Sequence, residues 1–213
     1  MSPLLLLGGT FSPVHLGHMR MAEIASESLG VSATFLINSI PPHKEAPSVT
    51  SADRLRMLGI ALQDTGFSID TRELRRSSPS YTSETLREIR AERPHDPVIF
   101  IIGMDSFRTI GSWHEAEELP GLASFFVIRR PGTEEPAEEE SFLARHAKKA
   151  GKAEEMLMAP AGWYFISERE CLPVSSTMIR KALADGEEPP LISPAVLKYI
   201  REKGLYRKEP FRS

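Results

Sequence analysis

An apolar run that stops at two glycines is the feature that most constrains how this chain can fold. Residues 4–7 are four leucines, and Gly8 and Gly9 end the run before a more polar segment begins. Two histidines, His15 and His18, follow at the start of a helical pattern. A buried strand, a glycine turn and a helix start in this order are typical of the phosphate-binding edge of a parallel α/β sheet. The stretch therefore predicts a nucleotide site near the N-terminus.

The composition limits the class of protein. The chain has 213 residues, 41% hydrophobic and 26% charged, which is ordinary for a soluble globular domain. Its net charge of −3 argues against a broad surface for nucleic acid or acidic membranes, so phosphate binding is expected to be local. The single cysteine, Cys171, excludes an intrachain disulfide and a zinc site of several thiolates. We expect a cytoplasmic protein, because no apolar run suits a signal peptide or a membrane span.

Apolar runs alternate with helical patterns along the chain. We predict strands at residues 4–7, 34–37, 67–70, 98–102, 125–128 and 163–166. We predict helices near residues 16–29, 52–65, 83–92, 142–150, 176–185 and 194–203. This alternation implies a Rossmann-like, doubly wound α/β fold, with helices on both faces of a mostly parallel sheet. Residues 1–213 are predicted to form one domain, on which the C-terminal helical part, about residues 174–207, packs.

One stretch differs in composition from the rest. Residues 131–155 are first acidic and then basic. Charge blocks of this kind are usually solvated loops or helix faces, and we expect the same here.

The two N-terminal histidines occupy positions that a helix brings together. His15 and His18 are three residues apart, so they project from neighbouring positions if the helix begins near Leu16. Gly17 between them allows a ligand to approach the backbone closely. A single histidine is more often structural than catalytic, but two beside a glycine turn and a helix start indicate an anion site.

A second motif lies near the C-terminus. Ser175, Ser176 and Thr177 precede a short helical pattern that ends at Gly186. These residues could serve only to cap the helix. Alternatively, their hydroxyls and the N–H groups of the helix N-terminus could bind phosphate together with Arg180, one turn along. The spacing alone leaves both interpretations open.

The two motifs together carry a family resemblance. Gly-Thr-Phe-Ser-Pro-Val-His-Leu-Gly-His at residues 9–18 and Ser-Ser-Thr-Met-Ile-Arg at residues 175–180 resemble the nucleotidyltransferases that share a (His/Thr)-x-Gly-His signature. Further segments resemble the bacterial nicotinate-nucleotide adenylyltransferases, in order: Pro-Pro-His-Lys at 41–44, Arg-x-x-Met-Leu at 54–58, Pro-Ser-Tyr-Thr at 79–82, Gly-x-Asp-Ser at 103–106, Trp113 and Gly-Leu-Tyr-Arg at 204–207. One position departs: Ser12 stands where that family usually carries an aspartate, so no role that needs a carboxylate is assigned there.

The resemblance implies an activity and a mechanism. AMP would pass from ATP to nicotinate mononucleotide, giving nicotinate adenine dinucleotide and pyrophosphate in NAD biosynthesis. The attacking phosphate is already an anion, so neither a general base nor a covalent intermediate is required. Catalysis would consist of positioning and of neutralising the charge that develops. Mg²⁺ is expected to arrive with ATP, held largely by phosphate oxygens and water, and no residue is assigned as a metal ligand.

The resemblance also assigns candidate site residues. His15, His18 and Arg180 are the catalytic candidates. The candidates for binding ATP are Gly8, Gly9, Thr10, Phe11, His15, Gly17, His18, Gly103, Asp105, Ser176, Thr177 and Arg180. The candidates for binding nicotinate mononucleotide are Lys44, Tyr81, Thr82, Asp105 and Trp113.

Three of the acceptor candidates also have a physical argument. Tyr81 and Thr82 precede a helical pattern, whose N-terminal N–H groups would favour a carboxylate over a neutral amide. Trp113 offers an aromatic face to the pyridine ring. On spacing alone, the first two could only cap a helix and Trp113 could only fill the core. Of the other histidines, His43 lies in the Pro-Pro-His-Lys loop, and His95, His114 and His146 are expected at the surface.

Other functions stay open at the level of sequence. The acceptor could be nicotinamide mononucleotide or another phosphorylated compound, such as a phosphopantetheine. A non-catalytic sensor could bind ATP without turnover, although intact His15, His18 and Arg180 argue against it. A class I aminoacyl-tRNA synthetase shares His-x-Gly-His, but the chain lacks a Lys-Met-Ser-Lys-Ser-like loop and a basic RNA face. Neither the oligomeric state nor the protonation of the two histidines can be read from the sequence.

Overall fold

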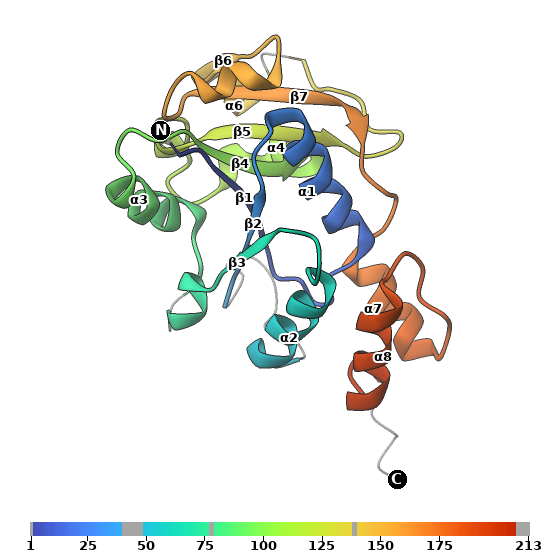
Figure 1. Ribbon diagram of the computed structural model, residues 1–213. Helices are drawn as coiled ribbons and strands as arrows, with labels where there is room; N and C mark the ends of the chain where they lie inside the picture. The colour runs from blue at the N-terminus through green and yellow to red at the C-terminus, as the bar shows by residue number, and fades with distance from the viewer. Residues whose placement is uncertain (1, 40–48, 77–78, 138–139, 208–213) are drawn as a thin grey trace.

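The part of the chain described by the computed structural model, residues 2–39, 49–76, 79–137 and 140–207, is built around a parallel sheet of seven strands (Figure 1). The strands are β1 (Leu4–Gly9), β2 (Ala33–Ile37), β3 (Ser68–Asp70), β4 (Val98–Gly103), β5 (Ser124–Arg129), β6 (Lys148–Lys149) and β7 (Trp163–Glu170). Their order is β3-β2-β1-β4-β5-β7-β6, and every neighbouring pair is parallel. The predicted doubly wound α/β fold is confirmed.

Helices cover both faces of the sheet, as the continuous apolar strands predict. They are α1 (Leu16–Leu29), α2 (Ser51–Ala61), α3 (Thr82–Glu92), α4 (Met104–Thr109), α5 (Leu119–Leu122), α6 (Phe142–His146), α7 (Ser176–Asp185) and α8 (Pro194–Lys203). Because side chains alternate along a strand, Leu5 and Ile101 pack under α1, α2, α7 and α8, whereas Leu6 and Phe100 pack under α3 to α6. Figure 1 shows α1 and α3 on opposite sides of the sheet.

The C-terminal helices join the core on the α1 side. Val196, Leu197 and Ile200 of α8 are buried, and α8 packs against α2 (Figure 1). The Tyr199 hydroxyl of α8 donates a hydrogen bond to Asp53 of α2 at 2.9 Å. This packing brings the N-terminal end of α7 to the loop that follows β1, where the site described below is formed.

Two of the predicted helices extend too far. The helix predicted over residues 142–150 ends at His146, and Lys148–Lys149 form β6 beside Trp163 at the start of β7. Lysines suit an edge strand, and Lys148 Nζ lies 4.0 Å from the Trp163 ring centroid. The helix predicted over residues 52–65 ends at Ala61, because a turn follows in which Thr65 Oγ1 donates to the Leu62 carbonyl. The prediction also missed α4, which follows β4 without an intervening loop.

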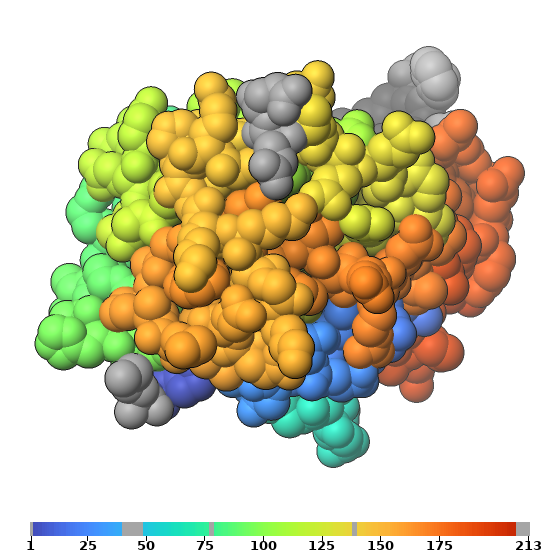
Figure 2. Space-filling model, turned by 90° about the horizontal axis from the view of Figure 1, so that it is seen from above, coloured from blue at the N-terminus to red at the C-terminus, as the bar shows by residue number. Residues whose placement is uncertain are grey.

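The described residues of the charged segment 131–155 lie largely at the surface. Lys148, Lys149 and Lys152 are exposed, as predicted, and the segment around α6 and β6 forms much of the face shown in Figure 2. Ala150 and Ala153 are nevertheless buried against the α1 side of the core. Among the described residues, no helix combines the length and the apolar character needed to cross a membrane.

Candidate functional site

Two adjoining cavities open at the carboxyl ends of β1 and β4. These strands are neighbours, but the chain leaves β1 toward one face of the sheet and β4 toward the other. Ligands of open α/β sheets bind at such a switch point. The larger cavity has a volume of about 730 Å³ and the smaller about 330 Å³. The residues that line both are Gly8, Gly9, Thr10, Phe100, Ser106 and Trp113.

The glycine edge of β1 is fixed by the packing around it. A Cβ on Gly8 would lie 2.6 Å from Phe100 Cζ, and a Cβ on Gly9 would lie 2.9 Å from the Phe11 ring. No larger residue fits without displacing an aromatic ring. The backbone at the shared edge of the two cavities therefore carries no side chains at Gly8 and Gly9, which allows a ligand to approach it closely.

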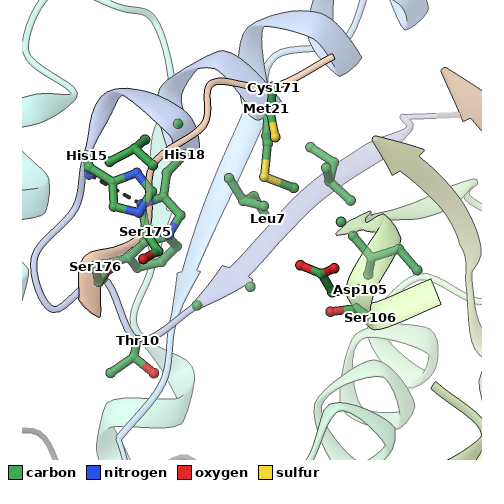
Figure 3. A pocket seen from close by; sticks show the side chains of 18 of the residues that line it. Leu7, Thr10, His15, His18, Met21, Asp105, Ser106, Cys171, Ser175 and Ser176 are labelled. Carbon is green, nitrogen blue, oxygen red and sulfur yellow. Dashed lines mark hydrogen bonds between the residues drawn. The ribbon is translucent and has the colours of Figure 1, made fainter. Parts of the chain in front are cut away.

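The two histidines form a stacked pair at the start of α1. Their rings lie 3.7 Å apart, centroid to centroid, at an interplanar angle of 24°. The His15 backbone N–H donates to His18 Nδ1 at 3.3 Å, so neutral His18 carries its proton on Nε2. Phe11 packs edge-on against His18, with centroids 5.1 Å apart. Figure 3 shows both rings on the same side of the larger cavity as Ser175 and Ser176.

His15 is neutral at neutral pH. Burial, and then the nearby charge of Arg130, lowers the pKa of His15 from its usual 6.5 to about 4. The residue is only 7% exposed. A neutral imidazole offers one N–H donor and one acceptor nitrogen, whereas the protonated ring offers two donors. Burial in the fold therefore favours the neutral form of His15, which the sequence alone does not indicate.

The N-terminus of α7 lies against the loop that follows β1. The Ser175 hydroxyl accepts a hydrogen bond from a backbone N–H of the first turn, so Ser175 is the cap. The Ser176 hydroxyl donates to the Pro13 carbonyl at 2.9 Å. Arg180 Nη2 donates to Thr177 Oγ1 at 3.1 Å. Ser176, Thr177 and Arg180 also line the larger cavity, so the motif both caps the helix and contributes to the site.

Ser12 joins three parts of the chain at this point. Its carbonyl accepts a hydrogen bond from Arg180 Nη1 at 2.8 Å. Its hydroxyl lies 3.0 Å from that of Tyr206, in the closing Gly-Leu-Tyr-Arg segment. Burial raises the pKa of Tyr206 to about 12, so the phenol stays neutral. The position therefore holds a neutral pair of hydroxyls in place of a carboxylate.

The opposite wall of the larger cavity follows β4 and β5. Asp105 and Ser106 belong to the first turn of α4 and face the histidines across the cavity (Figure 3). Arg130, the residue after β5, lies with its Nη1 atom 3.2 Å from Asp105 Oδ2. The sequence prediction missed Arg130, although it follows a buried strand just as Asp105 does. Asp105 lines only the larger cavity and not the smaller.

The smaller cavity lies at the N-terminus of α3. Tyr81 is the N-cap position and Thr82 the first helical residue, and both line the cavity. Trp113 stands at the junction of the two cavities. His114, for which only a surface position was expected, also lines this cavity, with its ring 4.2 Å from that of Tyr81. The prediction also missed the lining residues Asn38, Glu73 and Ser80.

The structure gathers the described candidate residues in one place. Each of them lines one or both cavities: Gly8, Gly9, Thr10, Phe11, His15, Gly17, His18, Tyr81, Thr82, Gly103, Asp105, Trp113, Ser176, Thr177 and Arg180. Lys44 and His43 lie outside the described residues. The roles of the individual side chains remain predictions. Within the described ranges, no cluster of three or more His, Cys, Asp or Glu side chains is arranged to hold a metal ion.

Sequence comparisons place this chain among nucleotide-transferring proteins. The family model described as "Cytidylyltransferase-like" matches residues 6–182. The chain is 40% identical over 210 residues to a protein of Aeromonas hydrophila subsp. hydrophila named "Probable nicotinate-nucleotide adenylyltransferase", covering 96% of this chain and 97% of the relative. A protein of the same name from Klebsiella pneumoniae subsp. pneumoniae is 40% identical over 208 residues, covering 94% of this chain and 95% of the relative.

Solved structures share the fold. The nicotinic acid mononucleotide adenylyltransferase of Plasmodium falciparum, complexed with NaAD, superposes with a TM-score of 0.76 at 19% identity. The match covers 97% of this chain and 98% of that one. A second structure of that enzyme, complexed with APC, gives a TM-score of 0.73 at 20% identity, covering 97% of this chain and 98% of that one. At this level of identity the likeness concerns the fold alone.

Proposed function

This chain belongs to the nicotinate-nucleotide adenylyltransferase family, and from that premise we propose that it transfers AMP from ATP to nicotinate mononucleotide, releasing pyrophosphate. The observation that carries the proposal is the pair of adjoining cavities that share the glycine edge of β1 and Trp113. Two substrates bound side by side would meet at that edge, with the phosphate of one beside the phosphates of the other.

The larger cavity suits ATP. The N-termini of α1 and α7 lie at its wall, and the positive end of a helix dipole favours phosphate. His18 and Arg180 add N–H donors from the same side. Arg180 already holds the Ser12 carbonyl through Nη1, so the arginine and the loop are positioned together.

The smaller cavity suits the pyridine nucleotide. The N-terminus of α3 at Tyr81 and Thr82 presents backbone N–H groups, which favour the carboxylate of nicotinate over the amide of nicotinamide. Trp113 and Tyr81 supply aromatic faces for the ring. The preference for the acid over the amide is therefore part of the proposal.

The reaction needs no ionised protein nucleophile. An oxygen of the mononucleotide phosphate attacks the α-phosphorus of ATP, a new P–O bond forms, and the bond to the β-phosphate breaks to release pyrophosphate. The His18 ring, through Nε2–H, and the Arg180 guanidinium donate hydrogen bonds to the oxygens on which negative charge builds. The residues fix geometry and stabilise charge, and no proton is transferred to them.

We propose that Mg²⁺ enters bound to ATP. Among the described residues lining the larger cavity, Asp105 is the one carboxylate, and it already pairs with Arg130. Phosphate oxygens and water would supply most of the ligands, as is usual for Mg²⁺ with nucleotides. The use of ATP is also consistent with the predicted cytoplasmic location.

The test compares two acceptors in one assay. Purified protein is mixed with ATP, Mg²⁺ and either nicotinate or nicotinamide mononucleotide, and pyrophosphate release and the dinucleotide product are measured. We expect kcat/KM for the acid to exceed that for the amide by roughly 10-fold, the scale of a charge at a helix N-terminus. A reaction without acceptor controls for hydrolysis of ATP. ATP binding without pyrophosphate from either acceptor would indicate a sensor and overturn the proposal.

A further inference from the structure

A buried arginine outside the proposed mechanism is hydrogen-bonded to the backbone at the edge that both cavities share. Arg54, on α2, is 1% exposed. No ion pair within the described parts of the chain involves it, and burial lowers the pKa of its guanidinium. Burying a charge without an ionic partner is energetically unfavourable, so the fold keeps this residue at a cost. The hydrogen bonds of its guanidinium indicate what the residue does.

The guanidinium bridges the ends of two neighbouring strands. Nη1 donates to the Thr10 carbonyl, at the edge shared by the cavities, over 2.8 Å. Nη2 donates to the Ser39 carbonyl, two residues beyond the end of β2, over 3.1 Å. Nη2 also donates to Ser51 Oγ over 3.0 Å, which fixes the guanidinium to the first residue of α2. One rigid group thus sets the separation of the loops after β1 and β2.

From Ser39 the connection continues into the acceptor cavity. The Ser39 backbone N–H donates to Ser80 Oγ at 3.3 Å, and their hydroxyls are also 3.3 Å apart. The Ser80 hydroxyl is hydrogen-bonded to Glu73, whose Oε1 accepts from Thr85 Oγ1 at 2.6 Å. Ser80 and Glu73 line the smaller cavity, and Thr85 lies in the first turns of α3. Ser80, Glu73 and Thr85 are buried, so water does not compete for these bonds.

We propose that Arg54 is a positioning residue that fixes the distance between the ATP cavity and the acceptor cavity through this hydrogen-bonded chain. The inference rests on the proposed function, because in-line attack needs both phosphates aligned with the reacting atoms about 3–3.5 Å apart. A change of about 1 Å in that alignment lowers the rate by roughly 100-fold, even when each substrate still binds. Arg54 therefore acts on kcat and not on the KM of either substrate.

Arg54→Lys is the informative variant, because lysine keeps the charge but cannot bridge two carbonyls with a planar fork. We expect kcat to fall about 10- to 100-fold while KM for ATP and for nicotinate mononucleotide changes by less than about threefold. Arg90→Lys is the matched control. Arg90, on α3, also donates to backbone carbonyls, those of Leu122, Arg93, Asp96 and Pro160, but it lines neither cavity. Its kcat is expected to stay within about twofold of wild type.

If the wild-type enzyme is active, two results for the Arg54→Lys variant would contradict the role proposed for Arg54. One is an Arg54→Lys enzyme with the kcat of wild type, which would mean that charge or packing alone matters. Another is a rise in KM for one substrate at unchanged kcat, which would make Arg54 a simple binding contact. A wild type that makes no product would overturn the proposed function itself, and this inference with it.

A second variant keeps the inference testable if Arg54→Lys does not fold. Ser80→Ala leaves every hydrogen bond of Arg54 in place and removes the next hydrogen bonds in the series, those between Ser39 and the Ser80 hydroxyl. We expect kcat to fall about 3- to 10-fold, the equivalent of one hydrogen bond. Where both variants fold, the double variant should lose less than the product of the single losses, because the two residues act in one chain. An unchanged kcat in Ser80→Ala, or fully multiplicative losses, would contradict the proposal.

Discussion

At the scale of single residues, two histidines that look equivalent in the sequence differ in the structure. His15 is buried and its pKa is lowered to about 4, whereas His18 is half-buried. His15 contacts His18 in two ways: its backbone N–H donates to His18 Nδ1, and the two rings stack. From this arrangement we expect the Nε2–H of His18 to donate to the charge that develops in the transition state, and His15 to orient the His18 ring.

Replacing His18 should therefore affect turnover more than folding. For His18→Ala we expect kcat to fall about 100- to 1,000-fold, the usual effect of removing one donor to a developing oxyanion. Pyrophosphate release measures the rate, and thermal unfolding checks that the protein is folded. His95→Ala, at an exposed position in the loop between α3 and β4, is the matched control and should keep full activity. A His18→Ala enzyme with nearly wild-type kcat would remove His18 from the mechanism.

At the scale of elements, the site is assembled from the ends of helices and strands. Residues Leu16, Thr82 and Ser176 begin α1, α3 and α7, and all three helix N-termini border the cavities. Each beginning has a local signal in the sequence, a glycine turn or a run of hydroxyl residues, so these parts of the site could be predicted. The β6 strand has no such signal, since Lys148 and Lys149 become a strand only by pairing with β7.

The Gly17 position tests how tightly α1 packs on the segment before α7. A Cβ there would lie 2.8 Å from Val174 Cγ1 and 3.0 Å from the His15 ring. Gly17→Ala should therefore lower the free energy of unfolding by about 1–3 kcal/mol, as overpacking does, and lower kcat as well. Gly59→Ala on α2, where an added Cβ meets nothing within 4 Å, should instead raise it by roughly 0.5–1 kcal/mol. Urea denaturation measures the free energy of unfolding of both variants. If both were more stable than the wild type, the packing of Gly17 against Val174 and His15 would not be tight.

At the scale of the whole molecule, the sequence predicts what is local and misses what depends on the folded arrangement. The alternation of apolar runs and helical patterns is sufficient for the sheet and its two helical layers. The hydrogen bonds from Thr10 through Arg54, Ser39 and Ser80 to Glu73 could not be predicted, because they join residues far apart in the chain. The neutrality of His15 likewise depends on burial and on Arg130, 115 positions away.

That buried histidine makes the stability of the molecule depend on pH. Because the pKa of His15 is about 4 when folded and 6.5 when unfolded, the unfolded state binds more protons as the pH falls below neutral. Stability is therefore full above about pH 6.5 and is lost on acidification, by about 2 kcal/mol between pH 7 and pH 5 and by roughly 3 kcal/mol below pH 4. Burial raises the pKa of Glu73, and its contribution has the opposite sign: it destabilises the fold at neutral pH and does so less as the pH falls.

The contribution of His15 is isolated by comparing wild type with His15→Asn, which lacks the titrating group but retains Glu73. Urea denaturation at pH 7, 6 and 5 gives the free energy of unfolding of both proteins. The difference between them should shrink by about 2 kcal/mol toward pH 5, because only the wild type must exclude a proton from position 15 in order to fold. Parallel losses in the two proteins would mean that His15 is protonated in the folded state. The proposed division of roles, with a neutral His15 orienting His18, would then fail.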